Sequence, residues 1–180
     1  MSCNKKPRLL VVDDDLGVIA AYRLVLEKSP DNRTVESLFG LEALEAELFG
    51  EKRPETQPPE WRITFLDQGI DAVKEVQWAI DDGDPYAAIF LDVRMPPGID
   101  GYEAAELIRK IDSDVHIVVV TGYSDYTYED FLEIAGPSDR LTYMPKPVWP
   151  DQLRVVARIL SGEKKSHRTL LSPLGVVRSA

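Results

Sequence analysis

The stretch AAIFLD, residues 87–92, decides the fold, because a run of apolar residues there ends in a single aspartate. Short runs of this kind are typical of buried strands in a parallel sheet, whose ligands gather beyond the carboxyl ends of the strands. Three similar runs also end in polar residues. They are LLVVDD (residues 9–14), HIVVVT (residues 116–121) and LTYMPK (residues 141–146). Polar side chains from all four runs are therefore expected to converge at one edge of a sheet.

The residues expected to converge suit a divalent cation and a phosphoryl group. They are Asp13, Asp14, Asp92, Thr121 and Lys146. Mg²⁺ takes oxygen ligands and is usually held by one or two carboxylates together with phosphate. A carboxylate can also be the nucleophile in phosphoryl transfer, whose transition state needs positioning and counter-charge. Without a cation, three neighbouring carboxylates repel one another, so we expect at least one raised pKa and stabilisation by metal.

Composition places limits on other functions. The chain has 180 residues, of which 44% are hydrophobic, and this indicates one globular domain with a small appendage. The net charge of -10 argues against a general nucleic-acid surface, since phosphate backbones are bound mainly through Lys and Arg. Cys3 is the only cysteine, so no internal disulfide can form. No apolar stretch is long enough for a membrane span or a signal core, and a cytoplasmic protein is expected.

Strand-like and helix-like stretches alternate along the chain, which is the pattern of a doubly wound α/β fold. Strands are predicted at 8–12, 63–66, 87–91, 115–120 and 141–144. Helices are predicted at 16–28, 70–82, 102–111, 129–135 and 152–160. Helical spacing predicts that Ile70, Val73, Val76 and Ile80 share one buried face, and that Ile159 points inward.

Two segments fall outside this alternation. Residues 35–61 carry a leucine stripe followed by a proline-rich stretch, and we interpret them as an inserted helix and loop before or within the second strand. The leucine stripe either covers the sheet or a neighbouring helix, or forms a docking or dimer surface. Residues 163–180 lack a sustained period and are expected to be a flexible tail after a domain at 1–162.

Four motifs in this order resemble the receiver (response-regulator) domain of two-component signalling. They are VVDDD (residues 11–15), IFLDVRMPPGIDG (residues 89–101), VVVTGYSD (residues 118–125) and YMPKPV (residues 143–148). The resemblance covers roughly residues 7–160, apart from the insertion. It implies a five-stranded parallel sheet of the flavodoxin-like (CheY-like) type with strand order 2-1-3-4-5.

The resemblance also implies a role for each site residue. It makes Asp92 the phosphoacceptor, Asp13 and Asp14 the acidic pair for Mg²⁺, the backbone carbonyl of Arg94 a further metal ligand, Thr121 and Lys146 the phosphoryl contacts, and Tyr143 the aromatic switch. Mn²⁺ is an expected substitute for Mg²⁺, and a cis peptide bond is implied at Lys146–Pro147.

The implied function is a signalling domain and not an ordinary enzyme. Its expected partners are a sensor histidine kinase or phosphotransfer protein, a downstream protein or output domain, and a second copy of the chain in a homodimer. No direct contact with nucleic acid or membrane is expected.

Two other functions stay open at this point. One is a pseudo-receiver that binds proteins without phosphorylation. The other is a haloacid-dehalogenase-like phosphatase, for which Asp13 and Asp15 have suitable spacing, although Gly17 stands where that family has Thr and only Asp151 follows Lys146 closely.

The chain also departs from the commoner receiver pattern. The loop MPPGID, residues 95–100, is one residue longer, and the stretch after Thr121 is rich in tyrosine. Tyr123, Tyr126 and Tyr128 form either an interaction surface or a partly buried aromatic loop, and we favour the loop.

Overall fold

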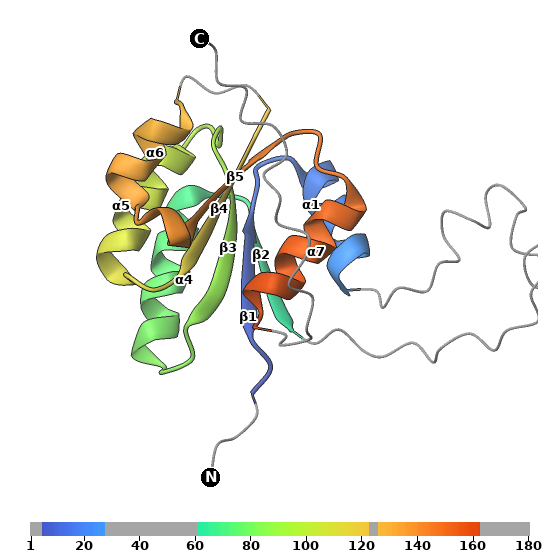
Figure 1. The fold of residues 1–180 in the computed structure, drawn as a ribbon, viewed down its shortest axis with the longest axis horizontal. Helices are drawn as coiled ribbons and strands as arrows, with labels where there is room; N and C mark the ends of the chain where they lie inside the picture. The colour runs from blue at the N-terminus through green and yellow to red at the C-terminus, as the bar shows by residue number, and fades with distance from the viewer. Residues whose placement is uncertain (1–4, 28–60, 123–125, 163–180) are drawn as a thin grey trace, which may run out of the picture.

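Five strands and the helices that connect them make up the part of the protein that the structure describes (Figure 1). The structure is a computed structural model, and it describes residues 5–27, 61–122 and 126–162. The strands are β1 (Arg8–Val12), β2 (Arg62–Leu66), β3 (Tyr86–Asp92), β4 (His116–Thr121) and β5 (Leu141–Pro145). The helices are α1 (Leu16–Glu27), α4 (Gly69–Asp81), α5 (Gly101–Ile111), α6 (Tyr128–Ala135) and α7 (Pro150–Leu160), with a 3-10 turn at Ser138–Arg140.

The sheet is parallel throughout, and its strand order is β2-β1-β3-β4-β5. This confirms the predicted doubly wound architecture and the predicted order 2-1-3-4-5. In the register, Val12 of β1 is opposite Leu91 of β3, and Asp92 is opposite Val120 of β4. The carboxyl ends of the three central strands therefore lie level with one another, so the polar residues that follow them meet at one edge.

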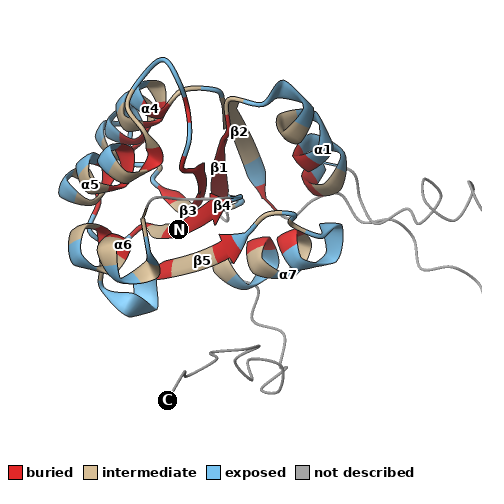
Figure 2. Cartoon of the chain, turned by 90° about the horizontal axis from the view of Figure 1, so that it is seen from above, coloured by how far each residue is buried: buried red, intermediate tan, exposed pale blue. Residues whose placement is uncertain are grey.

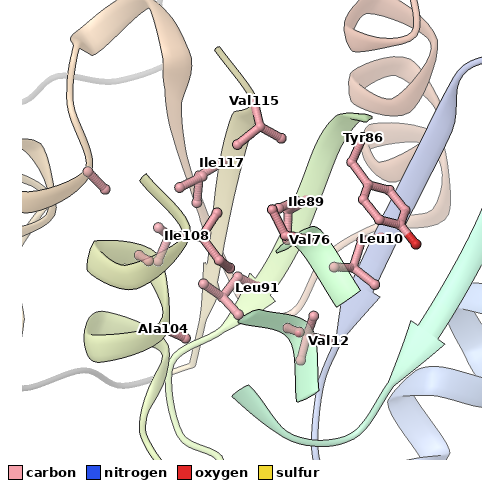
Figure 3. Packing of buried hydrophobic residues seen from close by; sticks show 14 of the residues in the cluster. Leu10, Val12, Val76, Tyr86, Ile89, Leu91, Ala104, Ile108, Val115 and Ile117 are labelled. Carbon is pink, nitrogen blue, oxygen red and sulfur yellow. The ribbon is translucent and has the colours of Figure 1, made fainter. Parts of the chain in front are cut away.

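Helices cover both faces of the sheet (Figures 1 and 2). One apolar cluster lies between the sheet and α4, α5 and α6, while the other lies beneath α1 and α7. Figure 3 shows part of the first cluster, in which Ala104 and Ile108 of α5 lie beside Leu91 and Ile117 of the sheet. Every residue of β1 is buried, because this strand has neighbours on both edges and helices on both faces.

Two predicted helix faces are wrong in detail. On α4 the fully buried side chains are Ala72, Val76 and Ala79, whereas Ile70 is 39% exposed. Small alanines on this face suit close packing of α4 against the sheet and α5. On α7 the buried pair is Leu153 and Ala157. Ile159 is 50% exposed, because it lies six residues after Leu153 and so points to another side of the helix. Both ends of β1 are as predicted, and the ends of the other elements lie within two residues of the predicted ones.

The two ends of the inserted segment lie side by side. The indole nitrogen of Trp61 donates a hydrogen bond of 3.1 Å to the carbonyl oxygen of Leu26 in the last turn of α1. The end of α1 and the residue before β2 therefore lie next to each other, an arrangement in which the predicted insertion would need little change in the surrounding fold. Residues 28–60 and 163–180 lie outside the described residues, so the predicted leucine-stripe helix and the domain boundaries stay predictions.

No helix among the described residues has the length and apolar character that crossing a membrane requires.

Candidate functional site

Four strands deliver the predicted site residues to one edge of the sheet. Asp13 follows β1 directly, Asp92 and Thr121 are the last residues of β3 and β4, and Lys146 follows β5. The main-chain amide of Lys146 donates a hydrogen bond of 2.7 Å to the carbonyl of Thr121, which keeps the last two strands paired to their ends. The structure thus brings these four residues together, as the sequence predicted.

The ammonium group of Lys146 bridges two of the carboxylates. Its Nζ atom lies 2.7 Å from Oδ2 of Asp13 and 2.7 Å from Oδ1 of Asp92. Both aspartates are buried, and the lysine side chain is 25% exposed. Charge-assisted contacts this short in a partly buried setting position all three groups firmly. The lysine approaches by a long aliphatic stem from a residue 133 positions away from Asp13, so only the fold creates this contact.

A third carboxylate makes the site a candidate metal centre. One ligand atom from each of Asp13, Asp14 and Asp92 lies within 4.8 Å of the others. The second oxygen of Asp13 accepts from the amide of Asp15, and the second oxygen of Asp92 accepts from the amide of Arg94, both at 3.0 Å. Main-chain amides therefore orient both buried carboxylates, while Asp14 is more exposed. Oxygen donors in this number match the preference of a hard cation such as Mg²⁺.

The charges at the site alter the pKa of two groups. Burial raises the pKa of Asp13, and the negative charge of Asp92 adds to this, although the hydrogen bond and charge of Lys146 oppose both effects. Burial alone would lower the pKa of Lys146, but its hydrogen bonds to Asp13 and Asp92 outweigh burial and the pKa is raised. The lysine is thus held as a cation. Negative charge exceeds positive charge among these four side chains, since Lys146 contacts Asp13 and Asp92 but not Asp14.

Thr121 has a buried hydroxyl group without a hydrogen-bond partner. Its side chain is 5% exposed, and among the described residues its Oγ1 is the only buried side-chain nitrogen or oxygen atom that lacks such a partner. Buried hydroxyls are normally hydrogen-bonded, because an unpaired one costs about 1 to 3 kcal/mol. The cost is understandable if the partner is a ligand oxygen that binds at this edge.

Tyr143 lies close to Thr121 on the same face of the sheet. It is opposite Val119 in the register, two residues before Thr121, and side chains two residues apart in a strand share a face. Its ring meets the ring of Tyr128 edge-on, with centroids 6.5 Å apart. Tyr126 and Tyr128 are both partly buried against the core, as predicted, while Tyr123 lies outside the described residues. The peptide bond Lys146–Pro147 is cis, as the resemblance implied.

Sequence reasoning missed two supporting residues. A side chain at Gly101 would collide with the carbonyl oxygen of Asp92, so glycine lets α5 begin against the end of β3. The amide of Gly101 also donates to the carbonyl of Val93 at 2.8 Å. The second is Asp100, which caps α5 through the amide of Glu103 at 2.9 Å. The adjacent Asp and Gly just before a helix were the available signal.

Comparison with known protein families identifies the family of the chain. Residues 59–158 match the response regulator receiver domain, and the chain belongs to this family. The match begins at residue 59, so it does not include Asp13 and Asp14. In the structure these two residues still lie at the site, because β1, which they follow, pairs with both β2 and β3. A search of curated proteins found no match.

Solved receiver structures share the fold at low sequence identity. A receiver domain protein from Methanospirillum hungatei has a TM-score of 0.54 and 20% identity, covering 86% of this chain and 93% of that chain. A receiver protein from Sinorhizobium medicae has a TM-score of 0.56 and 16% identity, covering 88% and 97%. The N-terminal domain of a response regulator/sensory box/GGDEF three-domain protein from Carboxydothermus hydrogenoformans has a TM-score of 0.53 and 15% identity, covering 86% and 93%.

Proposed function

We propose that Asp92 accepts a phosphoryl group from a phosphohistidine of a sensor histidine kinase or phosphotransfer protein. The observation that carries this proposal is the arrangement around Asp92: Lys146 lies 2.7 Å from it, and Thr121 offers a buried hydroxyl without a partner. The carboxylate, the cation and the donor are three groups that phosphoryl transfer to an aspartate requires. Membership of the receiver family supports this reading over the phosphatase alternative.

The acidic cluster fits a divalent cation. Asp13, Asp14 and Asp92 would hold Mg²⁺ together with the main-chain carbonyl of Arg94, and Mn²⁺ would suit the same oxygen ligands. A bound cation supplies positive charge for the phosphoryl oxygens and relieves the repulsion among the carboxylates. This requirement explains why an edge of the sheet keeps more negative than positive charge.

The proposed transfer uses the chain's own residues in defined roles. An oxygen of Asp92 attacks phosphorus and forms an acyl phosphate, while the bond from phosphorus to the histidine nitrogen breaks and the imidazole keeps the electron pair. The amide of Arg94 and the ammonium of Lys146 orient the attacking carboxylate. Lys146 then neutralises charge on the phosphoryl oxygens. The hydroxyl of Thr121 donates to one of those oxygens and so gains the partner that it lacks.

Phosphorylation would change the conformation of Thr121 and Tyr143. Movement of the Thr121 side chain toward the phosphoryl group frees space that the ring of Tyr143 occupies on the same face of the sheet. The surface formed by β5 and α6 changes as a result. A downstream protein or output domain, or a second copy of the chain, would read this change.

A labelling experiment tests the proposal. The protein is incubated with acetyl phosphate and Mg²⁺, and intact-mass spectrometry follows the gain of one phosphoryl group, with a chelator as the metal-free control. We expect Asp92→Asn to lose labelling entirely. The matched control is Asp84→Asn, which changes an aspartate at the opposite end of the sheet and should label like the wild type.

The outcomes separate the three functions. Hydroxylamine-sensitive label on the wild type and Asp84→Asn, but not on Asp92→Asn, supports the receiver mechanism. Complete absence of label on the wild type would favour the pseudo-receiver. Hydrolysis of a phosphate monoester over many turnovers, measured in a parallel assay, would favour the phosphatase.

A further inference from the structure

Tyr126 connects three separate segments of the protein. It lies between β4 and α6, two residues before the first residue of α6. Its ring stacks on the ring of Tyr102 in the first turn of α5, with centroids 4.3 Å apart and an angle of 11° between the planes. Its hydroxyl donates a hydrogen bond of 3.0 Å to Oδ2 of Asp100, whose other oxygen caps α5. Phe131 of α6 meets both tyrosine rings edge-on.

The start of α6 is therefore held on two sides. Tyr126 ties it to α5 on one side, and Tyr128 contacts Tyr143 of β5 on the other. Thr127 stands between these two tyrosines as the N-cap of α6, in a reciprocal capping box with Asp130. The capping box fixes the backbone at the start of α6, and Tyr126 and Tyr128 are the residues on either side of the N-cap.

We propose that the contact of Tyr126 with Tyr102 and Asp100 is a latch that favours the resting state of the receiver. The latch fixes the first turn of α6 and, through it, the position of Tyr128. Tyr128 in turn contacts Tyr143, the residue proposed to move toward Thr121. Tyr143 can change place only if this edge-on contact shifts, and the latch opposes that shift. Tyr126 is thus a positioning residue, because it acts through Tyr128 and Tyr143 and touches no reacting group.

The latch is well placed to sense the site. Asp100 lies in the loop that leads from Asp92 to α5, and the chain that carries Tyr126 begins at Thr121. The two strands that carry Asp92 and Thr121, β3 and β4, are therefore each followed in the sequence by a residue of the latch. The hydrogen bond from Tyr126 to Asp100 stabilises the conformation in which it forms. Its loss therefore raises the population of the other conformation.

The proposal rests on the proposed phosphorylation of Asp92, and the test separates the two. Tyr126→Phe removes the hydroxyl while keeping the ring stack, and Tyr126→Leu removes both. The matched control is Tyr86→Phe, which removes a hydrogen-bonded hydroxyl at the opposite end of the sheet. For each protein, titration calorimetry measures the dissociation constant of beryllofluoride, a phosphoryl mimic, at saturating Mg²⁺, and the dissociation constant of Mg²⁺ alone. Amide hydrogen exchange then compares the first turn of α6 with α5.

We expect Tyr126→Phe to bind beryllofluoride about threefold to tenfold more tightly than the wild type, the equilibrium effect of one ordinary hydrogen bond. Exchange in the first turn of α6 should accelerate by a similar factor, and Tyr126→Leu should exceed Tyr126→Phe in both readouts. The affinity for Mg²⁺ alone should not change, and Tyr86→Phe should match the wild type in beryllofluoride affinity even if it is less stable.

The two proposals fail in different ways. If the wild type binds beryllofluoride but Tyr126→Phe binds it equally or more weakly, the latch is wrong and the phosphoacceptor role stands. If the wild type does not bind beryllofluoride in the presence of Mg²⁺, the proposed function is wrong and the latch proposal falls with it.

Discussion

The two ends of the sheet both hold buried charge, but they balance it in opposite ways. At the amino end, Arg8 of β1 is buried and surrounded by partners. Its guanidinium donates to Glu75, to the hydroxyl of Tyr86 and to the carbonyl of Asp84, and it lies over the Tyr86 ring at 4.2 Å. At the carboxyl end, three carboxylates lie together, Lys146 contacts only two of them, and the hydroxyl of Thr121 has no hydrogen-bond partner.

This difference distinguishes polar groups that stabilise the fold from polar groups that bind a ligand. A buried charge with several hydrogen-bond partners around it contributes to the fold that surrounds it, because those partners are already engaged with one another. The hydroxyl of Tyr86 illustrates this, because it contacts Arg8, Thr64 and Glu75, all within 2.8 Å. An edge with surplus charge and an unused donor is destabilising by itself, and a ligand is needed to complete it.

Mg²⁺ should produce the largest difference between the two ends. At a concentration a hundred times its dissociation constant, Mg²⁺ should raise the free energy of unfolding by about 2.7 kcal/mol, because it binds only the folded protein. Asp14→Asn should lose most of this gain, whereas Asp84→Asn at the amino end should keep it. Urea unfolding with Mg²⁺ or with a chelator measures both. An equal Mg²⁺ response in the two variants would show that the cation does not bind at the Asp13, Asp14 and Asp92 cluster.

Substitution of Arg8 should give the next largest change in the free energy of unfolding. Arg8→Met removes the guanidinium but keeps much of the aliphatic stem, and it leaves Glu75 and Tyr86 without their shared cation. We expect a loss of about 2 kcal/mol in stability, less than for a fully buried pair because Glu75 is 25% exposed. Urea unfolding measures the loss, and the affinity for Mg²⁺ should stay at the wild-type value. Weakened Mg²⁺ binding would show that the two ends are coupled.

A pair of threonine substitutions should act in opposite directions. Thr121→Val removes the hydroxyl without a partner and should raise the stability of the unphosphorylated, Mg²⁺-free protein by about 1 kcal/mol. Thr64→Val removes the hydroxyl that lies within hydrogen-bond distance of the Tyr86 hydroxyl, at 2.8 Å, and should lower stability by about 1 kcal/mol. Both substitutions exchange similar volumes on a strand, so thermal unfolding compares them directly. Destabilisation of equal size at both positions would mean that the Thr121 hydroxyl is satisfied in the free protein.

The same contrast explains which features the sequence could predict. The site residues were predictable because each one directly ends or follows an apolar strand, so the topology alone places them at one edge. The Arg8 network was not, because Arg8, Glu75 and Tyr86 lie in separate elements and only the packing of α4 on β1 and β3 brings them together. The buried face of α4 was mispredicted for a related reason. Hydrophobicity favoured Ile70 and Ile80, whereas close packing selected Ala72 and Ala79.

A decrease in pH should affect stability differently at the two ends of the sheet, and we expect this effect to be the smallest. Burial lowers the pKa of His116, at the amino end of β4, below its ordinary 6.5, and the charges of Arg140 and Arg109 lower it further. A depressed pKa means that the unfolded chain takes up the proton first. The stability that neutral His116 contributes is therefore fully present above pH 6.5 and is lost as the pH falls below it and through the folded-state pKa. Burial raises the pKa of Asp13 instead, so a proton there relieves repulsion at the carboxyl end.

His116→Gln isolates the histidine, because its amide can keep the hydrogen bond to Thr142 that His116 makes at 2.8 Å. Urea midpoints at pH 7 and pH 5 should show a smaller decrease for this variant than for the wild type. A chelator in both buffers keeps cation binding out of the comparison. If the two proteins lose the same stability between these pH values, His116 accepts a proton in the folded state as easily as in the unfolded chain. The amino end would then tolerate added positive charge near Arg109 and Arg140.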